Sequence, residues 1–365
     1  FLNGDFQETI AQLTEKMQKA SDEMRFEDAA EARDLIRSIQ KIGERQKITS
    51  YGEEDRDIIA CDMDESLDLR EQDAVVQVFF MRDGKLIESG PMAELSGEEI
   101  VEKMLGHELS DIYPPARPPH SEETLLRVEG LHDEALLKDI SLHLRKGEIL
   151  GIAGLAGAGK TELCKALFGA SKSRVTRGEL NHQPWQPRDP ADSVLRGLAL
   201  VPEERRKEGI FIDEPVSMNL AVTADNSFSR WSLFGHRQAW RWAEEVIARV
   251  GVRARGPGQV LRRLSGGNQQ KVAIGKWLRN DASVLIFDEP TKGVDVKAKT
   301  DLFQLIDGLA REGKGVIYAS GEFAELVGLC DRICVLWDGR VVAEIAGAEA
   351  REETLLYYST GGTAS

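Results

Sequence analysis

The chain has 365 residues, of which 41% are hydrophobic and 30% charged, and this length predicts two or three folded units. It holds no run of the ~18 to 20 apolar residues that a membrane-spanning helix needs, so we expect a cytoplasmic protein that meets a membrane only peripherally, through a partner. Residues 1–80 carry 20 acidic and 10 basic side chains. An excess of acids is repelled by phosphates, so direct nucleic-acid binding is not expected.

Residues 1–50 predict a helical hairpin. Apolar side chains recur in steps of four and three from Phe6 to Met24, and a second helical pattern rich in alanine follows from Phe26. Only a residue or two separates the two patterns, so the helices should pack antiparallel. Such a hairpin buries little surface and needs a partner. The alternative is a solvated coiled coil.

The string Met24–Ile36 resembles the UVR helical hairpin of the excinuclease UvrC, a DNA-repair nuclease. Phe1–Asp5 and Asp73–Phe80 resemble the segments that flank it in that family. The resemblance covers about 80 residues and implies docking of residues 1–50 on UvrB, the excision-repair partner that carries the matching hairpin. Neither nuclease domain of the family is complete here, so it implies no cleavage activity.

Residues 51–81 are predicted as an acidic connector with short strands. Within them, residues 53–73 hold many acids and few apolar side chains, so we expect a mobile or weakly ordered segment there.

An internal repeat follows. Arg82-Asp-Gly-Lys-Leu-Ile87 recurs as Trp337-Asp-Gly-Arg-Val-Val342, and further matches keep the same offset of 255 residues. Asp-Gly between short apolar runs predicts a β-hairpin in each copy, followed by an acidic helix. We therefore interpret residues 82–120 as the remnant of an earlier domain copy plus a proline-rich linker, and residues 121–365 as the complete copy.

Residues 148–153 predict a buried strand that leads into Gly154-Leu-Ala-Gly-Ala-Gly-Lys-Thr161 and then a helix, the context of a phosphate-binding loop. Its backbone would turn amides onto the β- and γ-phosphates of a nucleotide. Lys160 would neutralise these phosphates and assist catalysis, and the Thr161 hydroxyl would bind Mg²⁺. The candidate nucleotide-binding residues of the loop are Gly154, Gly157, Ala158, Gly159, Lys160 and Thr161.

A second motif, Val284-Leu-Ile-Phe-Asp-Glu-Pro290, predicts a core strand that ends in two acids. The carboxyl end of such a strand lies beside a phosphate loop in α/β proteins. Asp288 is the candidate Mg²⁺ ligand. Glu289 is the candidate catalytic residue that orients or deprotonates the attacking water.

A third motif, Leu264–Lys271, stands directly before a predicted helix. Ser265, Gly266 and Gly267 would form an anion site at the start of that helix, directed at a nucleotide held by an opposing domain. An ordinary serine N-cap is the alternative.

Together these motifs make residues 121–365 resemble the ATPases of ABC transporters, and residues 82–110 resemble the end of a preceding cassette. Asn268–Lys271 and Thr291–Lys299 are similar to the carbohydrate importers, whose ATPases carry two fused cassettes. The resemblance implies an α/β P-loop fold with a RecA-like core and a helical subdomain at about 213–280. It also implies ATP and Mg²⁺ as cofactors, and two partners: a second cassette and a transmembrane sugar permease.

Two positions depart from the family pattern. Glu203 stands where cassettes have a glutamine that links ATP to the membrane subunits, as in second cassettes of the subfamily, and it is a candidate nucleotide-binding residue. Gly321 stands where a histidine contacts the γ-phosphate, and glycine has no side chain to donate. We expect intact nucleotide binding and weak hydrolysis.

The leading hypothesis is the second nucleotide-binding cassette of a sugar importer, fused to a UvrC-like segment. The alternative is a nucleotide-excision-repair protein that docks through its hairpin. An ABC-type repair ATPase is disfavoured because it would carry zinc-binding Cys-x-x-Cys pairs. The four cysteines (Cys61, Cys164, Cys330 and Cys334) instead predict buried, reduced thiols.

Overall fold

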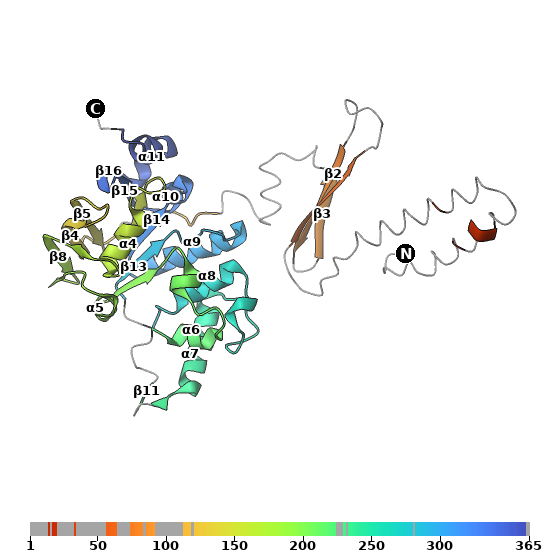
Figure 1. Cartoon of the computed structure of the whole chain (residues 1–365), viewed down its shortest axis with the longest axis horizontal. Helices are drawn as coiled ribbons and strands as arrows, with labels where there is room; N and C mark the ends of the chain where they lie inside the picture. Colours follow the sequence, from red (N-terminus) through yellow and green to blue (C-terminus); the bar gives the residue numbers. More distant parts are fainter. Residues whose placement is uncertain are drawn as a thin grey trace. The chain divides into compact units, whose positions relative to one another are not determined.

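The computed structural model divides the chain into two compact units, Phe1–Met104 and Leu105–Ser365, and each is described by itself (Figure 1). The structure describes residues 14, 17–19, 33, 56–63, 74–82, 85–91, 112–117, 120–223, 229–230, 233–279 and 282–362. Most of the predicted helical hairpin lies outside the described residues, and of residues 1–50 those at 14, 17–19 and 33 are helical.

Three antiparallel strands form the described part of the first unit, in the order β1 (Arg56–Met63), β2 (Ala74–Arg82) and β3 (Lys85–Pro91). β2 and β3 pair antiparallel up to Arg82 and Lys85, so the predicted hairpin is confirmed. β1 lies within residues 51–81, where short strands are predicted, and pairs with β2 along its full length; the weak order of residues 53–73 stays a prediction. β1 contains the β-favouring run Ile58-Ile59, and pairing with β2 outweighs the many neighbouring acids.

The second unit is built on a six-stranded sheet. Five strands are parallel and only the last pair is antiparallel. The spatial order is β10 (Leu198–Val201), β13 (Val284–Asp288), β14 (Gly315–Ser320), β6 (Ile149–Ala153), β15 (Arg332–Trp337) and β16 (Arg340–Ala346). Every residue of β6, β13 and β14 is buried. The two predicted core strands are therefore confirmed as central strands, which explains their continuous apolar runs.

A second, antiparallel sheet packs beside the first and lies to its left in Figure 1. Its strands are β5 (Ile140–Arg145), β4 (Thr124–Asp133), β8 (Arg177–Leu180) and β9 (Gln183–Pro184), with β7 (Ser173–Arg174) paired to β4. Two short strands, β11 (Ser229–Arg230) and β12 (Leu233–Phe234), pair with each other elsewhere in the unit.

Helices α6 (Val216–Ala221), α7 (His236–Val250) and α8 (Gly266–Gly275) pack on one another within the predicted helical subdomain. α6 and α7 lie below the sheet in Figure 1. The other helices of this unit are α4 (Lys160–Phe168), α5 (Pro190–Leu195), α9 (Val296–Arg311), α10 (Phe323–Leu329), α11 (Glu352–Ser359), the π-helix η3 (Arg205–Gly209) and the 3₁₀ helices η4 (Leu261–Arg263) and η5 (Gly347–Glu349). α4, α9 and α10 contact the sheet strands.

The complete copy of the repeat forms the hairpin that its sequence predicts. β15 and β16 are joined at Asp338-Gly339, where φ is 45° and 71°. Left-handed values at both turn residues suit the right-handed twist of the strands and favour Asp-Gly. Gly339 is also needed sterically, because a Cβ there would lie 1.9 Å from the Leu136 carbonyl oxygen.

Three of the four cysteines, Cys164, Cys330 and Cys334, are buried free thiols, as predicted. Burial raises the pKa of each thiol, to about 12 for Cys334. The side chain of Cys61 lies outside the described part of the chain.

A buried carboxylate on α10 ties together three segments of the second unit. Glu325 is 2% exposed and accepts hydrogen bonds from the hydroxyls of Thr291 (2.9 Å), Tyr318 (2.8 Å) and Ser320 (3.0 Å). Its other oxygen pairs with Lys299 on α9 at 2.9 Å. These contacts join β14 and α9 to the loop that follows Glu289.

Removal of the Glu325 carboxylate should therefore destabilise the unit strongly. We expect Glu325→Ala to lower the free energy of unfolding by about 3–5 kcal/mol, because three buried hydroxyls lose their acceptor and the partly buried Lys299 loses one of its two carboxylate partners. Glu322→Ala is the matched control: Glu322 also pairs with Lys299, at 2.6 Å, but its side chain is 58% exposed. It should cost about 0–1 kcal/mol. Equal losses in urea denaturation of the two variants would contradict this role for Glu325.

Candidate functional site

The carboxyl ends of neighbouring parallel strands converge on one edge of the large sheet. β6 leads into the glycine-rich loop, β13 ends at Asp288, β14 ends at Ser320 and β10 is followed by Glu203. In open α/β sheets this edge is where ligands bind. The sequence motifs of the core therefore meet in space, although β14 lies between β6 and β13.

The glycine-rich loop has the backbone conformation that its sequence predicts. Gly157 and Gly159 adopt φ values of 82° and 109°, which side chains disfavour. No atom lies within 4 Å of the position of a Cβ on Gly157, so the backbone there is open to a ligand. At Gly154 a Cβ would lie 2.9 Å from both Ala158 and the Leu336 carbonyl oxygen, so only glycine fits.

Lys160 begins α4 and folds back over the loop. Its ammonium donates to the carbonyl oxygens of Gly154 (2.7 Å) and Leu155 (3.4 Å), and the residue is only 8% exposed. It lies 3.5 Å from the Glu289 carboxylate. The two predicted catalytic residues are thus neighbours, and the loop holds a buried positive charge beside its open amides.

Thr161 connects the loop to two of the predicted acids. Its hydroxyl lies 3.1 Å from Oδ1 of Asp288 and 3.3 Å from Oε2 of Glu203. One hydroxyl and two carboxylates form a set of hard oxygen donors, of the kind that Mg²⁺ prefers. Among the described residues no group of three or more His, Cys, Asp or Glu side chains is placed to hold a metal ion. Phosphate oxygens would therefore have to complete the shell of a bound ion.

Burial raises the pKa of Asp288 to about 6, and the hydrogen bond from Thr161 opposes this shift. The folded-state pKa lies above the ordinary value of 3.8, so the folded protein binds more protons between these two pH values. Stability contributed by this group is therefore present at low pH and is lost as the pH rises through about 6.

Asp288→Asn should consequently stabilise the ligand-free protein at neutral pH. We expect the free energy of unfolding at pH 7.5 to rise by about 1–3 kcal/mol and the gain to vanish near pH 4, because asparagine has no charge to desolvate. Urea denaturation at both pH values measures this, with Asp213→Asn, which changes an exposed aspartate, as control. An increase in the free energy of unfolding that is the same at both pH values would rule out desolvation of the Asp288 charge as its cause.

Glu289 is held by its backbone in an unusual conformation. Its φ is 46°, in the left-handed region, and its amide donates to the Ala319 carbonyl oxygen at 2.9 Å. Strain of this kind clusters at functional sites. A Cβ on Gly321 would lie 3.4 Å from Oε1 of Glu289 and 3.8 Å from Nζ of Lys160. The segment after β14 therefore reaches the site but adds no side chain to it at Gly321.

Two side chains, Glu203 and Arg205, hold the segment after β10 against the loop that follows Glu289. Glu203 pairs with Lys292 at 2.5 Å, and Arg205 donates to the carbonyl oxygens of Lys292 (2.9 Å) and Gly293 (3.4 Å). The hydrogen bond from Lys292 lowers the pKa of Glu203. Sequence reasoning did not assign Lys292 or Arg205. Lys292 does lie within the quoted Thr291–Lys299 string, but nothing in the sequence shows that it meets Glu203.

The third motif lies beside this loop. Ser265 is the N-cap of α8, and its hydroxyl accepts from the Asn268 amide at 3.4 Å. The alternative interpretation, that Ser265 is the N-cap of the helix, is thus confirmed. It does not exclude an anion site, because the first amides of a helix have no partner within it. The atoms nearest to a Cβ on Gly266 belong to Arg205 and Gly293, and those for Gly267 to Ala298 and Val294, so these glycines pack on the 293–298 segment.

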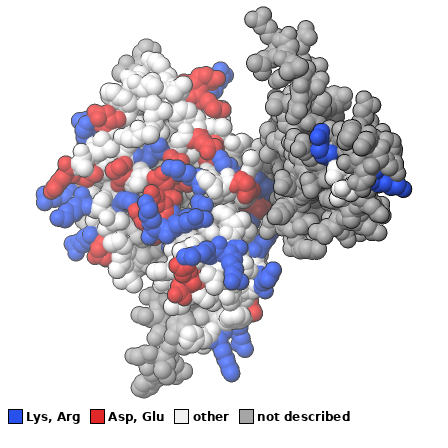
Figure 2. Space-filling model, turned by 45° about the vertical axis from the view of Figure 1, so that its right-hand side comes forward, with Lys and Arg blue, Asp and Glu red and all other residues white. Residues whose placement is uncertain are grey.

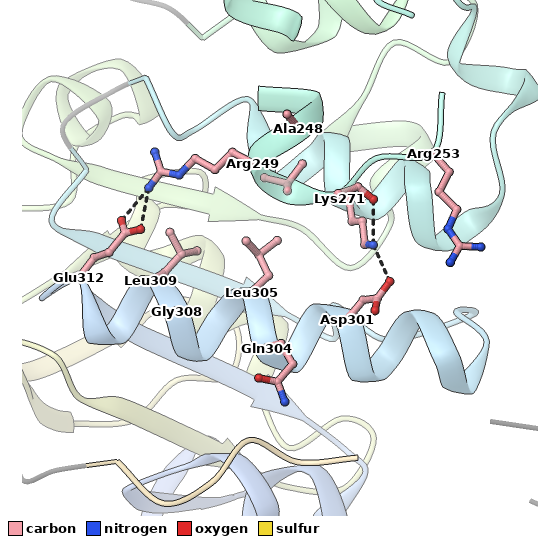
Figure 3. A pocket seen from close by; sticks show the side chains of 12 residues that line it. Ala248, Arg249, Arg253, Lys271, Asp301, Gln304, Leu305, Gly308, Leu309 and Glu312 are labelled. Carbon is pink, nitrogen blue, oxygen red and sulfur yellow. Dashed lines mark hydrogen bonds and ion pairs between the residues drawn. The ribbon is translucent and has the colours of Figure 1, made fainter. Parts of the chain in front are cut away.

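A groove of about 530 Å³ lies away from the glycine-rich loop. It is lined by the C-terminal end of α7, by Lys271 of α8 and by one side of α9. Figure 3 shows Leu305 and Leu309 of α9 facing the end of α7, with an ion pair on either side. Arg249 pairs with Glu312 at 2.7 Å, and Lys271 pairs with Asp301 at 2.6 Å. The groove is thus the boundary between the helical subdomain and the core.

Acidic and basic side chains are intermixed over much of the face shown in Figure 2.

Each part of the chain matches a known family model over some of its length. Residues 137–292 match the family described as ABC transporter, and residues 7–42 match the UvrB/uvrC motif. The ribose import ATP-binding protein RbsA of Bacillus subtilis (strain 168) is 37% identical over 288 residues, which are 78% of this chain and 58% of that protein. The ribose import ATP-binding protein RbsA 2 of Mesorhizobium japonicum is 34% identical over 92% of this chain and 63% of its own length.

The chain thus spans little more than half the length of several curated relatives that it matches. Among solved structures, a nucleotide-free ATP-binding cassette from an ABC transporter superposes with a TM-score of 0.55 at 20% identity, covering 65% of this chain and 95% of that one. A dimeric ATP-binding cassette bound to ADP and Pi gives 0.51 at 21%, covering 60% and 98%. These likenesses show the fold. Within the described residues no helix is both long and apolar enough to cross a bilayer.

Proposed function

Since the chain carries an ABC transporter ATPase domain, we propose that it binds and hydrolyses Mg·ATP as the second cassette of a sugar importer. The observation that carries this proposal is the meeting of Lys160, Thr161, Asp288 and Glu289 around the open amides of the glycine-rich loop. The proposal is supported by the curated relatives of the chain, which are named as ribose or galactose import ATP-binding proteins.

Each residue of the site would have its own role in phosphoryl transfer. The amides from Gly157 to Thr161 hold the β- and γ-phosphates, and Lys160 places a buried positive charge on them. Glu289 orients the attacking water and takes its proton. Thr161, Asp288 and Glu203 would hold Mg²⁺, which when bound neutralises charge on the phosphate oxygens. Gly321 contributes no donor, which supports the proposal that hydrolysis is weak.

A second cassette should close over this site. Ser265, Gly266 and Gly267 lie at the start of α8, whose first amides have no partner within the helix, so they are proposed to cap a nucleotide held by the opposing cassette. The relative that covers 92% of this chain extends well into the first unit. It supports the interpretation of residues 82–120 as the end of a preceding cassette. The transported sugar would pass through transmembrane permease subunits, on whose cytoplasmic side the chain would dock.

The match of residues 7–42 to the UvrB/uvrC motif favours a second candidate function. In that case the chain docks on the excision-repair protein UvrB through residues 1–50, and the ATPase domain takes no part in docking. Capture of purified UvrB by the full chain, lost when residues 1–50 are deleted, would support this candidate.

Titration of the folded chain with ATP, with and without Mg²⁺, tests the leading proposal. We expect saturable binding that is tighter in the presence of the metal ion. A chain that unfolds cooperatively yet leaves Mg·ATP unbound would overturn the proposed function.

A further inference from the structure

Lys292 lies at the candidate site without a role in the mechanism above. It follows Glu289 by one turn, and its amide donates to the Glu289 carbonyl oxygen at 3.1 Å. Its ammonium pairs with Oε1 of Glu203 at 2.5 Å, and Oε2 of the same carboxylate lies 3.3 Å from the Thr161 hydroxyl. Two contacts therefore separate this ammonium from the predicted metal-binding hydroxyl.

The carboxylates near the glycine-rich loop outnumber the lysines, and one of these lysines, Lys292, is free to move toward a bound phosphate. Lys292 pairs with Glu203, which with Asp288 contacts the Thr161 hydroxyl, and Lys160 lies 3.5 Å from Glu289, so three carboxylates and two lysines surround the loop. Lys160 is buried against the loop, whereas the side chain of Lys292 is 66% exposed and can change partner without unpacking. A triphosphate bound at the loop would bring several negative oxygens toward Lys292, which then compete with the single charge of Glu203.

The position of Lys292 favours the terminal phosphate over the inner ones. The loop amides would contact the β- and γ-phosphates, and the loop after β13 begins with Glu289, which must face the water that attacks the γ-phosphorus. The segment after β14 offers only Gly321 at this place. A lysine one turn beyond Glu289 is therefore placed to supply a charged donor near the γ-phosphate.

We propose that Lys292 is a second cationic ligand of the terminal phosphate of ATP, held on Glu203 until the nucleotide binds. This inference rests on the proposed function and adds a residue to the same site. Its consequence is selectivity: Lys292 should strengthen binding of a nucleoside triphosphate and leave binding of a diphosphate unchanged. A lysine that only clamps the 292–293 loop to Glu203 would affect both nucleotides alike.

Equilibrium binding of Mg·ADP and of the non-hydrolysable Mg·AMP-PNP to the full chain tests this without requiring turnover. We expect Lys292→Met to weaken AMP-PNP about tenfold, the size of one charge-assisted contact, and to leave ADP within about twofold. Lys292→Arg, which keeps the charge, should retain affinity for AMP-PNP within about threefold. Lys207→Met is the matched control, because Lys207 pairs with the neighbouring Glu204 at 2.6 Å on an exposed surface; neither affinity should change.

The outcomes separate the two proposals. Unchanged dissociation constants for both AMP-PNP and ADP in Lys292→Met overturn the role of Lys292 while leaving nucleotide binding intact. An equal loss of affinity for both nucleotides also overturns it, in favour of a structural clamp. Failure of the unsubstituted chain to bind either nucleotide refutes the proposed function itself, and the role of Lys292 falls with it.

Discussion

Lys160→Ala should weaken the binding of Mg·ATP at least about 100-fold. The ammonium of Lys160 is buried and already directed over the loop by its bond to the Gly154 carbonyl oxygen. On nucleotide binding it would donate to phosphate oxygens in a site from which water is largely excluded. Two charge-assisted hydrogen bonds at about 1.5–3 kcal/mol each amount to roughly two to four orders of magnitude in affinity.

Titration calorimetry measures this loss, and thermal denaturation confirms that the variant is folded. Lys165→Ala is the matched control because Lys165 lies on the same helix α4 but pairs with Glu208 at 2.9 Å, away from the loop. Its affinity should equal that of the unsubstituted chain. Equal affinity for Lys160→Ala and the unsubstituted chain would contradict the assignment of the phosphate loop.

Glu289→Gln should separate binding from chemistry. Glutamine has the shape of glutamate but cannot accept the proton of the attacking water. We expect the single-turnover rate of hydrolysis to fall by about 10²- to 10⁴-fold and the affinity for Mg·ATP to stay within about threefold. Loss of the Lys160 pair at 3.5 Å should have little effect on affinity, because the phosphates replace Glu289 as the partner of Lys160.

The same variant tests closure by a second cassette. Trapping ATP without hydrolysis should favour the closed state, so Glu289→Gln with Mg·ATP should elute as a dimer in size-exclusion chromatography if two copies can face each other. Glu322→Gln, which changes a nearby exposed acid, is the control for both measurements. An undiminished single-turnover rate in Glu289→Gln would remove Glu289 from the catalytic role.

The elements that the sequence predicts are those defined by neighbours along the chain. The apolar run before Gly154 and the run before Asp288 became central buried strands, and both Asp-Gly pairs stand between strands that pair antiparallel. Each of these depends on the backbone preferences and polarity of fewer than about ten consecutive residues. The pairing of β1 with β2 could not be predicted in this way, because the partner strand lies further along the chain.

Short motifs in the amino-acid sequence predict the chemistry of the candidate site: a glycine loop with a lysine and a hydroxyl, and a strand that ends in two acids. Which of these side chains meet depends on how the chain folds. Thr161 and Asp288 are separated by 127 positions, and Glu203 and Lys292 by 89. The pairing of Lys292 with Glu203 and the gathering of three hydroxyls on Glu325 arise from strand order and helix packing. Local periodicity carries no information about such contacts, because they form only when the sheet brings distant strand ends to one edge.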